Sequence, residues 1–113
     1  MNRGEIVEVS WPYSDLSGTK VRPAVVVQAD FLNSLIDDTI FVKITTKQFG
    51  IPGTEVALDP AQETNSGLTK LCYASCNNLL TRDQAIAGPI VGFLSDAVMQ
   101  QIEACLKIVL QIP

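Results

Sequence analysis

The run from Val21 to Gln28, V-R-P-A-V-V-V-Q, is the feature that most constrains how this chain can fold. Its centre is apolar at four consecutive positions, which are Ala24, Val25, Val26 and Val27. Consecutive branched residues favour a strand that is buried on both faces. Pro23 suits the start of such a strand, because the N–H that it lacks needs no partner there. The run therefore predicts a central strand with Arg22 at its rim.

Arg22 permits two interpretations. In the first interpretation, the residue before proline is restricted to extended geometry. The backbone of Arg22 would then be held in one conformation, and its guanidinium could be oriented toward a phosphate. In the other interpretation, Arg22 is a solvated charge at a strand edge and Pro23 protects that edge from pairing. Taken alone, these two residues favour the second interpretation.

Further short strands are predicted where apolar residues alternate between clusters of turn-forming residues. They cover residues 5–10, 39–45, 54–58, about 68–76, and 86–93, the last being bent by Gly88-Pro89. Residues 14–20 have turn composition and form a loop that leads to Arg22. Residues 29–38 predict a helical turn or compact loop, and residues 77–84 are less regular.

The last part of the chain predicts a helix. Ser95 is a good N-cap with Asp96 in the first turn. The apolar residues then follow at three- and four-residue spacing, at Val98, Ile102, Leu106, Val109 and Leu110. This pattern indicates an amphipathic helix of about four turns. The expected fold is mainly β with helices (α+β), a small curled barrel in a single domain over residues 1–113.

Composition sets the cellular expectations. The chain of 113 residues is 47% hydrophobic and 18% charged, which is typical of a globular protein. Its apolar runs fall short of the roughly 18 residues of a membrane helix, and its first residues lack the apolar core of a signal peptide. The three cysteines are too few for a disulfide framework. We therefore expect a cytoplasmic protein with no membrane partner.

Charge and residue usage exclude several chemistries. The net charge of −4 argues against indiscriminate binding to nucleic acid, although six of the eight cations lie in the middle of the chain. The absence of histidine excludes Ser-His and Cys-His catalysis and a histidine-bound metal. Cys72 and Cys76 share one face of a strand and are expected to be core thiols. No metal or other cofactor is expected.

Hydrogen-bond donors collect at predicted strand ends and loops. They are Arg22, Thr45, Thr46, Lys47, Asn77, Asn78 and Thr81. None of them must ionise as an acid in order to donate. Such donors, with no evident base, suit a phosphate substrate that carries its own nucleophile, as RNA does in its 2′-hydroxyl. Arginine and threonine could stabilise the phosphoryl oxygens as negative charge builds.

Seven segments resemble, in the same order, the MazF/PemK toxins of bacterial type II toxin–antitoxin systems. They read R-G-E-I-V-E-V, D-L-S-G-T-K, V-R-P-A-V-V-V, I-T-T-K, G-L-T-K, L-L-T-R-D and G-F-L-S-D. The likeness spans nearly the whole chain. The R-P-A-V-V element with a downstream I-T-T is fairly specific, and the C-terminal match is loose.

The resemblance implies an SH3-like barrel, a homodimer, and a metal-independent endoribonuclease (mRNA interferase) that cuts single-stranded RNA at short sequences. It implies that Arg22 and Thr45 act at the scissile phosphate and that the loop from Ser17 to Lys20 borders the RNA channel. The remaining expected RNA contacts are Thr46, Lys47, Asn77, Asn78 and Thr81. An antitoxin peptide is the expected protein partner, with operator DNA bound through the antitoxin complex.

The chain departs from the family at the site. Many members carry an arginine where Ser75 stands and an acidic residue two places on, where this chain has Asn77. The loop before Arg22 is short and lacks the Glu-Gln often found in the family, so the general base is unassigned. Two functions stay open: a ribonuclease toxin, and a weakened or non-catalytic module that binds antitoxin or nucleic acid on the same fold.

Overall fold

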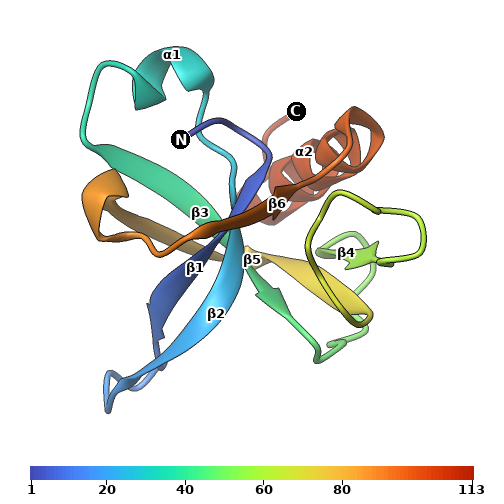
Figure 1. Cartoon of the computed structure of the whole chain (residues 1–113). Helices are drawn as coiled ribbons and strands as arrows, with labels where there is room; N and C mark the ends of the chain where they lie inside the picture. The colour runs from blue at the N-terminus through green and yellow to red at the C-terminus, as the bar shows by residue number, and fades with distance from the viewer.

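The computed structural model describes residues 1–113 and contains one six-stranded antiparallel sheet. Its strands are β1 (Glu5–Pro12), β2 (Thr19–Val26), β3 (Asp38–Thr45), β4 (Glu55–Leu58), β5 (Cys72–Asp83) and β6 (Ile90–Phe93). The helices are α1 (Asp30–Asn33), the 3-10 turn η1 (Gln84–Ile86) and α2 (Asp96–Leu110). The strands are ordered β4-β5-β3-β2-β1-β6 and curl into a half-barrel, with α2 packed against β4 and β5 (Figure 1). The predicted mainly β fold with a C-terminal helix is confirmed.

Alternation along the central strands creates a core on each face of the sheet. On β3, Val42 and Ile44 belong to a cluster of 13 buried residues that also includes residues of α2. Phe41 points to the other face and joins a cluster of 6 buried residues contributed by β1, β2 and β3. The prediction that β2 is buried on both faces is confirmed, because Ala24, Val25 and Val26 are all 0% exposed.

The loop between β4 and β5 links the two edges of the sheet. The Phe93 N–H of β6 donates to the Asn65 carbonyl at 2.9 Å. Gly92 lies so close to the backbone of Asn65 and Ser66 that a side chain would collide with it. Gly67 has a φ of +73° and faces the Val91 carbonyl, where a Cβ would also collide. These glycines allow the loop to lie directly on β6 and complete the curl.

The prediction for β5 is wrong at both ends. The expected strand over 68–76 begins only at Cys72, and the expected irregular segment 77–84 is strand as far as Asp83. A bulge explains the irregular pattern, because Val42 pairs with Leu79 while the next residue, Lys43, pairs with Ser75. The intervening residues of β5 have no partner on β3, which breaks the alternation that predicts a strand.

Two other boundaries also differ from the prediction. Residues 86–93 are strand only at Ile90–Phe93, and the preceding segment forms η1, whose N-cap Asp83 accepts from the Ala85 N–H at 2.8 Å. β2 begins at Thr19 rather than Val21, so the first hairpin loop is shorter than residues 14–20. Thr19 pairs with Pro12 and Lys20 with Trp11, so these two polar residues belong to the strand pairing and not to the loop.

The C-terminal helix is confirmed, and of the residues predicted for its apolar face only Leu110 does not pack against the core. Ser95 caps it by accepting the Val98 N–H at 3.3 Å. The buried residues are Met99, Ile102 and Cys105, with Val98, Leu106 and Val109 partly buried against the core. Leu110 is 51% exposed, because it lies about 80° around the helix axis from Ile102. No helix of the structure is long and apolar enough to cross a bilayer.

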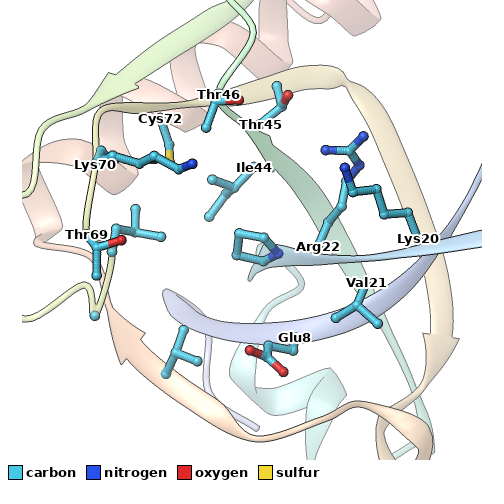
Figure 2. A pocket seen from close by; sticks show the side chains of 14 residues that line it. Glu8, Lys20, Val21, Arg22, Ile44, Thr45, Thr46, Thr69, Lys70 and Cys72 are labelled. Atoms are coloured by element: carbon cyan, nitrogen blue, oxygen red, sulfur yellow. Dashed lines mark hydrogen bonds between the residues drawn. The ribbon is translucent and has the colours of Figure 1, made fainter.

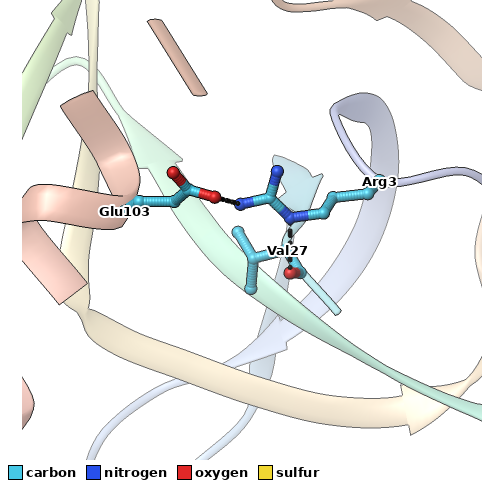
Figure 3. Close-up of polar contacts among 3 residues, drawn as sticks. All are labelled: Arg3, Val27 and Glu103. Atoms are coloured by element: carbon cyan, nitrogen blue, oxygen red, sulfur yellow. Dashed lines mark hydrogen bonds and ion pairs between the residues drawn. The ribbon is translucent and has the colours of Figure 1, made fainter. Parts of the chain in front are cut away.

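Arg3 fastens the N-terminal segment to both β2 and α2 (Figure 3). Its Nε donates to the Val27 carbonyl at 3.1 Å, and its Nη2 forms an ion pair with Glu103 Oε1 at 2.9 Å. This is the only ion pair of the protein. Arg22 therefore has no carboxylate partner that neutralises its charge.

Candidate active site

The pairing of β2 with β3 places three polar side chains on one face of the sheet. Ala24 lies opposite Lys43, and continuing that register by two residues brings Arg22 opposite Thr45. Residues two apart on a strand point to the same face. Arg22, Lys43 and Thr45 therefore share a face, opposite to the face that α2 covers, and we call it the site face. The strand pairing explains why residues 23 positions apart in the sequence meet.

Arg22 and Thr45 line one open cleft with about 350 Å³ of free volume, which we call the arginine–threonine cleft. The other charged or hydroxyl side chains of this cleft are those of Glu8, Lys20, Thr46, Thr69 and Lys70. Figure 2 shows Lys20 and Arg22 on the side near Thr45, whereas Glu8 lies at the far end beyond Val21. The positive charge is thus concentrated next to Thr45, and the single carboxylate of the cleft lies away from it.

Arg22 also lines a second cleft of about 530 Å³, formed largely by the loop after β1, which we call the loop cleft. Lys43 from β3 and Asn78 from the bulge of β5 stand on its other side, and Tyr13 and Ser17 come from the loop. Because the same guanidinium borders both clefts, Arg22 occupies the ridge between them. A bound chain that crosses this ridge would contact Arg22 from either side.

Thr45 is held in place at the end of β3. It is 8% exposed, and its Oγ1 accepts the Lys47 N–H at 3.2 Å. A hydroxyl that accepts in this way keeps its own hydrogen for donation. Thr45 can therefore donate to an anion in the arginine–threonine cleft without changing its rotamer.

Positive charge gathers on the site face of a protein whose net charge is −4. Burial is the main cause that lowers the pKa of Lys43, and the charges of Arg22 and Lys47 lower it further. These three cations come from β2, β3 and the segment just after β3. Such a concentration of like charges on one face of the sheet favours an anionic ligand such as a phosphate.

The bulge of β5 arranges three polar residues in a small hydrogen-bonded group. Ser75 Oγ donates to Asn77 Oδ1 at 3.0 Å, and Asn78 Nδ2 donates to Ser75 Oγ at 2.8 Å. Ser75 is only 1% exposed. Asn78 reaches the loop cleft, whereas exposed Asn77 lines neither cleft.

The predicted site residues divide into four groups. Those that line the arginine–threonine cleft are Lys20, Arg22, Thr45 and Thr46, and those of the loop cleft are Ser17, Arg22 and Asn78. Lys47 and Asn77 adjoin these clefts without lining them, and the Lys47 ammonium lies 4.9 Å from the centre of the Phe49 ring. Thr81 pairs with Ile40, which places it about 16 Å along β3 from Thr45. The structure does not bring Thr81 to the site.

Among the lining residues that sequence reasoning missed are Glu8, Lys43 and Lys70. Lys43 could have been found, because the alternation of the predicted strand 39–45 puts it on the same face as Thr45. Glu8 and Lys70 gave no such signal, since their proximity depends on how β1 and the loop before β5 fold around the cleft.

Neither a metal centre nor a reactive thiol contributes to these clefts. No group of three or more histidine, cysteine or acidic side chains is arranged to hold a metal ion. Cys72 and Cys76 are buried, as predicted for core thiols. Burial raises the pKa of Cys76 to about 12. The side chains available for chemistry are therefore the cations, the hydroxyls, the Asn78 amide and the carboxylates of Glu8 and Asp15.

Comparison with known proteins identifies the family of this chain. Residues 2–110 match the model of a family described as the PemK-like, MazF-like toxin of type II toxin-antitoxin systems. An endoribonuclease in complex with its cognate antitoxin from Mycobacterial species superposes with a TM-score of 0.82 and 25% identity, covering 100% of this chain and 97% of that one. Comparison with curated proteins finds no match.

Two further solved structures share the fold. The Mycobacterium tuberculosis toxin MazF-mt6 has a TM-score of 0.77 at 20% identity, covering 98% of this chain and 99% of that one. A MazE-MazF structure from Deinococcus radiodurans has a TM-score of 0.76 at 17% identity, covering 100% and 98%. The family resemblance expected from the sequence motifs is confirmed.

Proposed function

Because this chain belongs to the PemK-like, MazF-like toxin family of type II toxin–antitoxin systems, we propose that it is a metal-independent, sequence-specific endoribonuclease for single-stranded RNA. The observation that carries this proposal is the meeting of Arg22 and Thr45 at one open cleft. The similar endoribonuclease from Mycobacterial species supports an RNA-cleaving activity.

The reaction uses a nucleophile that the substrate supplies. The 2′-hydroxyl of RNA attacks the adjacent phosphorus, and negative charge increases on the non-bridging oxygens. The guanidinium of Arg22 can donate two parallel hydrogen bonds to those oxygens, and the hydroxyl of Thr45 adds a third. The products are a 2′,3′-cyclic phosphate and a 5′-hydroxyl end, because the nucleophile is internal.

The partners follow from the same surface. Lys20, Arg22 and Lys47 present positive charge to an RNA strand, and an acidic-apolar antitoxin tail would compete for them. The active protein is a homodimer, in which isologous pairing covers apolar surface. Operator DNA is bound through the antitoxin complex.

Competition for the site can be measured directly. The antitoxin should lose affinity when Lys20, Arg22 and Lys47 are all replaced, and unchanged affinity would refute a shared surface. Light scattering at micromolar concentration should give twice the monomer mass of 12.2 kDa. A monomer mass would refute the dimer.

The activity is tested by incubating the purified protein with a mixed RNA in chelator and mapping the new ends. Arg22→Lys should lower the cleavage rate by about 10²-fold or more, because lysine keeps the charge but loses the planar fork. Lys107→Met, which removes an exposed cation from α2, is the matched control and should cleave normally. The melting temperature of Arg22→Lys should stay close to wild type, since Arg22 is only half-buried within β2 and lysine keeps its charge.

Three results would contradict the proposal. They are undiminished cleavage by Arg22→Lys, a requirement for magnesium, and 5′-phosphate ends. RNA binding without any cleavage by the wild type would instead identify a non-catalytic module. This outcome must be tested because the chain has Ser75 where many family members carry an arginine.

A further inference from the structure

We propose that Lys43 is a catalytic residue of this site, and that its ammonium protonates the 5′-oxygen that leaves the scissile phosphate. This inference rests on the proposed ribonuclease activity and deepens it by assigning the general acid. Neither the sequence motifs nor the family resemblance pointed to Lys43.

The position of Lys43 is fixed by strands on both sides. It pairs with Ala24 of β2 and with Ser75 of β5, so it lies at the centre of the sheet on the site face. Thr45 is two residues along the same strand, and Arg22 is two residues from the pairing partner Ala24. Lys43 and Arg22 line the loop cleft together. Because Arg22 borders both clefts, a phosphate bound to the loop-cleft side of its guanidinium would face Lys43 across that cleft.

The small neighbours of Lys43 leave room for its side chain. Ala24 has no atoms beyond Cβ, and Ser75 is buried and turned into its hydrogen bonds with Asn77 and Asn78. Many members of the family carry an arginine on β5 where this chain has Ser75. In this chain the positive charge near that position comes from Lys43 on β3. The charge is supplied from the adjacent strand.

Burial and the neighbouring cations favour release of the Lys43 proton. Arg22 faces it from β2, and Lys47 approaches from the segment after β3. The loop contributes Tyr13 and Asp15 to the same cleft, and β5 contributes only neutral groups there. Burial, followed by the charges of Arg22 and Lys47, lowers the pKa of Lys43. A general acid works best when its pKa lies near the working pH.

Other groups near the phosphate are poorly suited to this step. Arg22 cannot give up a proton in a protein. The hydroxyl of Thr45 is a far weaker acid than an ammonium and is committed to the phosphoryl oxygens. Glu8 lies at the far end of the arginine–threonine cleft, beyond Val21 (Figure 2). Lys20 also lies near Arg22, but it is exposed at the start of β2, whereas Lys43 is half-buried between two strands and shares the loop cleft with Arg22.

The step balances without any further reactant. The bond from the 2′-oxygen to phosphorus forms as the bond from phosphorus to the 5′-oxygen breaks. The electron pair of the broken bond goes to the 5′-oxygen, which takes a proton from the Lys43 ammonium. The proton of the 2′-hydroxyl passes to water, and the neutral Lys43 amine regains a proton from solvent.

The test uses a substrate whose leaving group needs no proton. One RNA oligonucleotide has an ordinary phosphodiester at the mapped cleavage site, and its partner has sulfur in place of the bridging 5′-oxygen. A thiolate leaves readily without protonation because thiols are much stronger acids than alcohols. Wild type, Lys43→Met, Lys43→Arg and the control Lys107→Met are compared on both substrates, and thermal melts verify that each variant is folded.

Lys43→Met should lose about 10²- to 10⁴-fold in rate on ordinary RNA, which is the usual contribution of a general acid, and less than tenfold on the sulfur substrate. Lys43→Arg should behave in the same way, because arginine keeps the charge but cannot transfer the proton. Binding of an uncleavable 2′-deoxy substrate should change little in Lys43→Arg. Lys107→Met should match wild type on both substrates.

Equal losses on the two substrates would overturn the inference, because they would make Lys43 a phosphate-binding residue. Full activity of Lys43→Met on ordinary RNA would also overturn it. In both cases the wild type still cleaves RNA, so the proposed function stands. A wild type that cleaves neither substrate would refute the proposed function and the inference together.

Discussion

Replacement of Asn33 tests a buried group of hydrogen bonds that connects the end of β2 to the start of β3. Asn33 lies in α1, between the end of β2 and the start of β3. Its Oδ1 accepts from Gln28 Nε2 at 2.9 Å and from Thr39 Oγ1 at 2.7 Å, and its Nδ2 donates to the Gln28 carbonyl at 3.1 Å. The three residues are 8%, 7% and 0% exposed, in the order Asn33, Gln28 and Thr39. Water cannot readily replace the lost bonds.

The expected magnitude follows from the groups that Asn33→Ala leaves unpaired. The Thr39 hydroxyl loses its acceptor and the Gln28 carbonyl loses its donor, whereas the Gln28 amide keeps its bond to the Asp38 carbonyl at 2.9 Å. A buried polar group without a partner costs about 1–3 kcal/mol. We therefore expect the free energy of unfolding to fall by about 4 kcal/mol, a large part of the ~5–15 kcal/mol of a typical domain.

Urea denaturation of Asn33→Ala, Thr39→Val and the double variant measures this effect. Thr39→Val should lose about 1 kcal/mol, because Asn33 keeps its bonds to Gln28. The double variant should lose less than the sum of the single variants, since the orphaned hydroxyl is then absent. A loss below about 1 kcal/mol for Asn33→Ala, or strict additivity in the double variant, would refute the reasoning.

Three further predictions concern the site, the closing loop and the core. Thr45→Ala should slow RNA cleavage roughly tenfold, less than Arg22→Lys, because it removes one neutral hydrogen bond; cleavage rates and thermal melts check this. Gly67→Ala should lower the free energy of unfolding by about 3 kcal/mol or more, since it combines left-handed backbone strain with a collision at the Val91 carbonyl. Gly50→Ala should lower it by only about 1–2 kcal/mol, because Gly50 has a φ of +79° but no atoms near the added Cβ. Urea denaturation of both variants measures the difference. Native Cys76 should resist thiol reagents at pH 8 and react on unfolding, because burial raises its pKa to about 12; rapid labelling of the folded protein would contradict this.

Local pattern was sufficient for the elements with regular periodicity. The branched run after Pro23 predicted β2, alternation predicted β3 and β4, and Ser95 with the apolar spacing that follows predicted α2. Pattern failed at β5, because a bulge across Cys76 and its neighbours removes the period of two on which the prediction depends. It also failed for the exposed end of α2, where burial depends on what the helix packs against.

The sequence by itself determined the family and the mainly β class, and it predicted Arg22 and Thr45 as a candidate site, because these depend on motifs and on the local pattern of residue types. The tertiary structure alone decided which polar residues adjoin that pair. Strand register placed Lys43 between Ala24 and Ser75, and the same register carried Thr81 away from the site. The physical reason is that register and bulges join residues far apart in the chain, and a change of one residue in either would move a side chain to the opposite face.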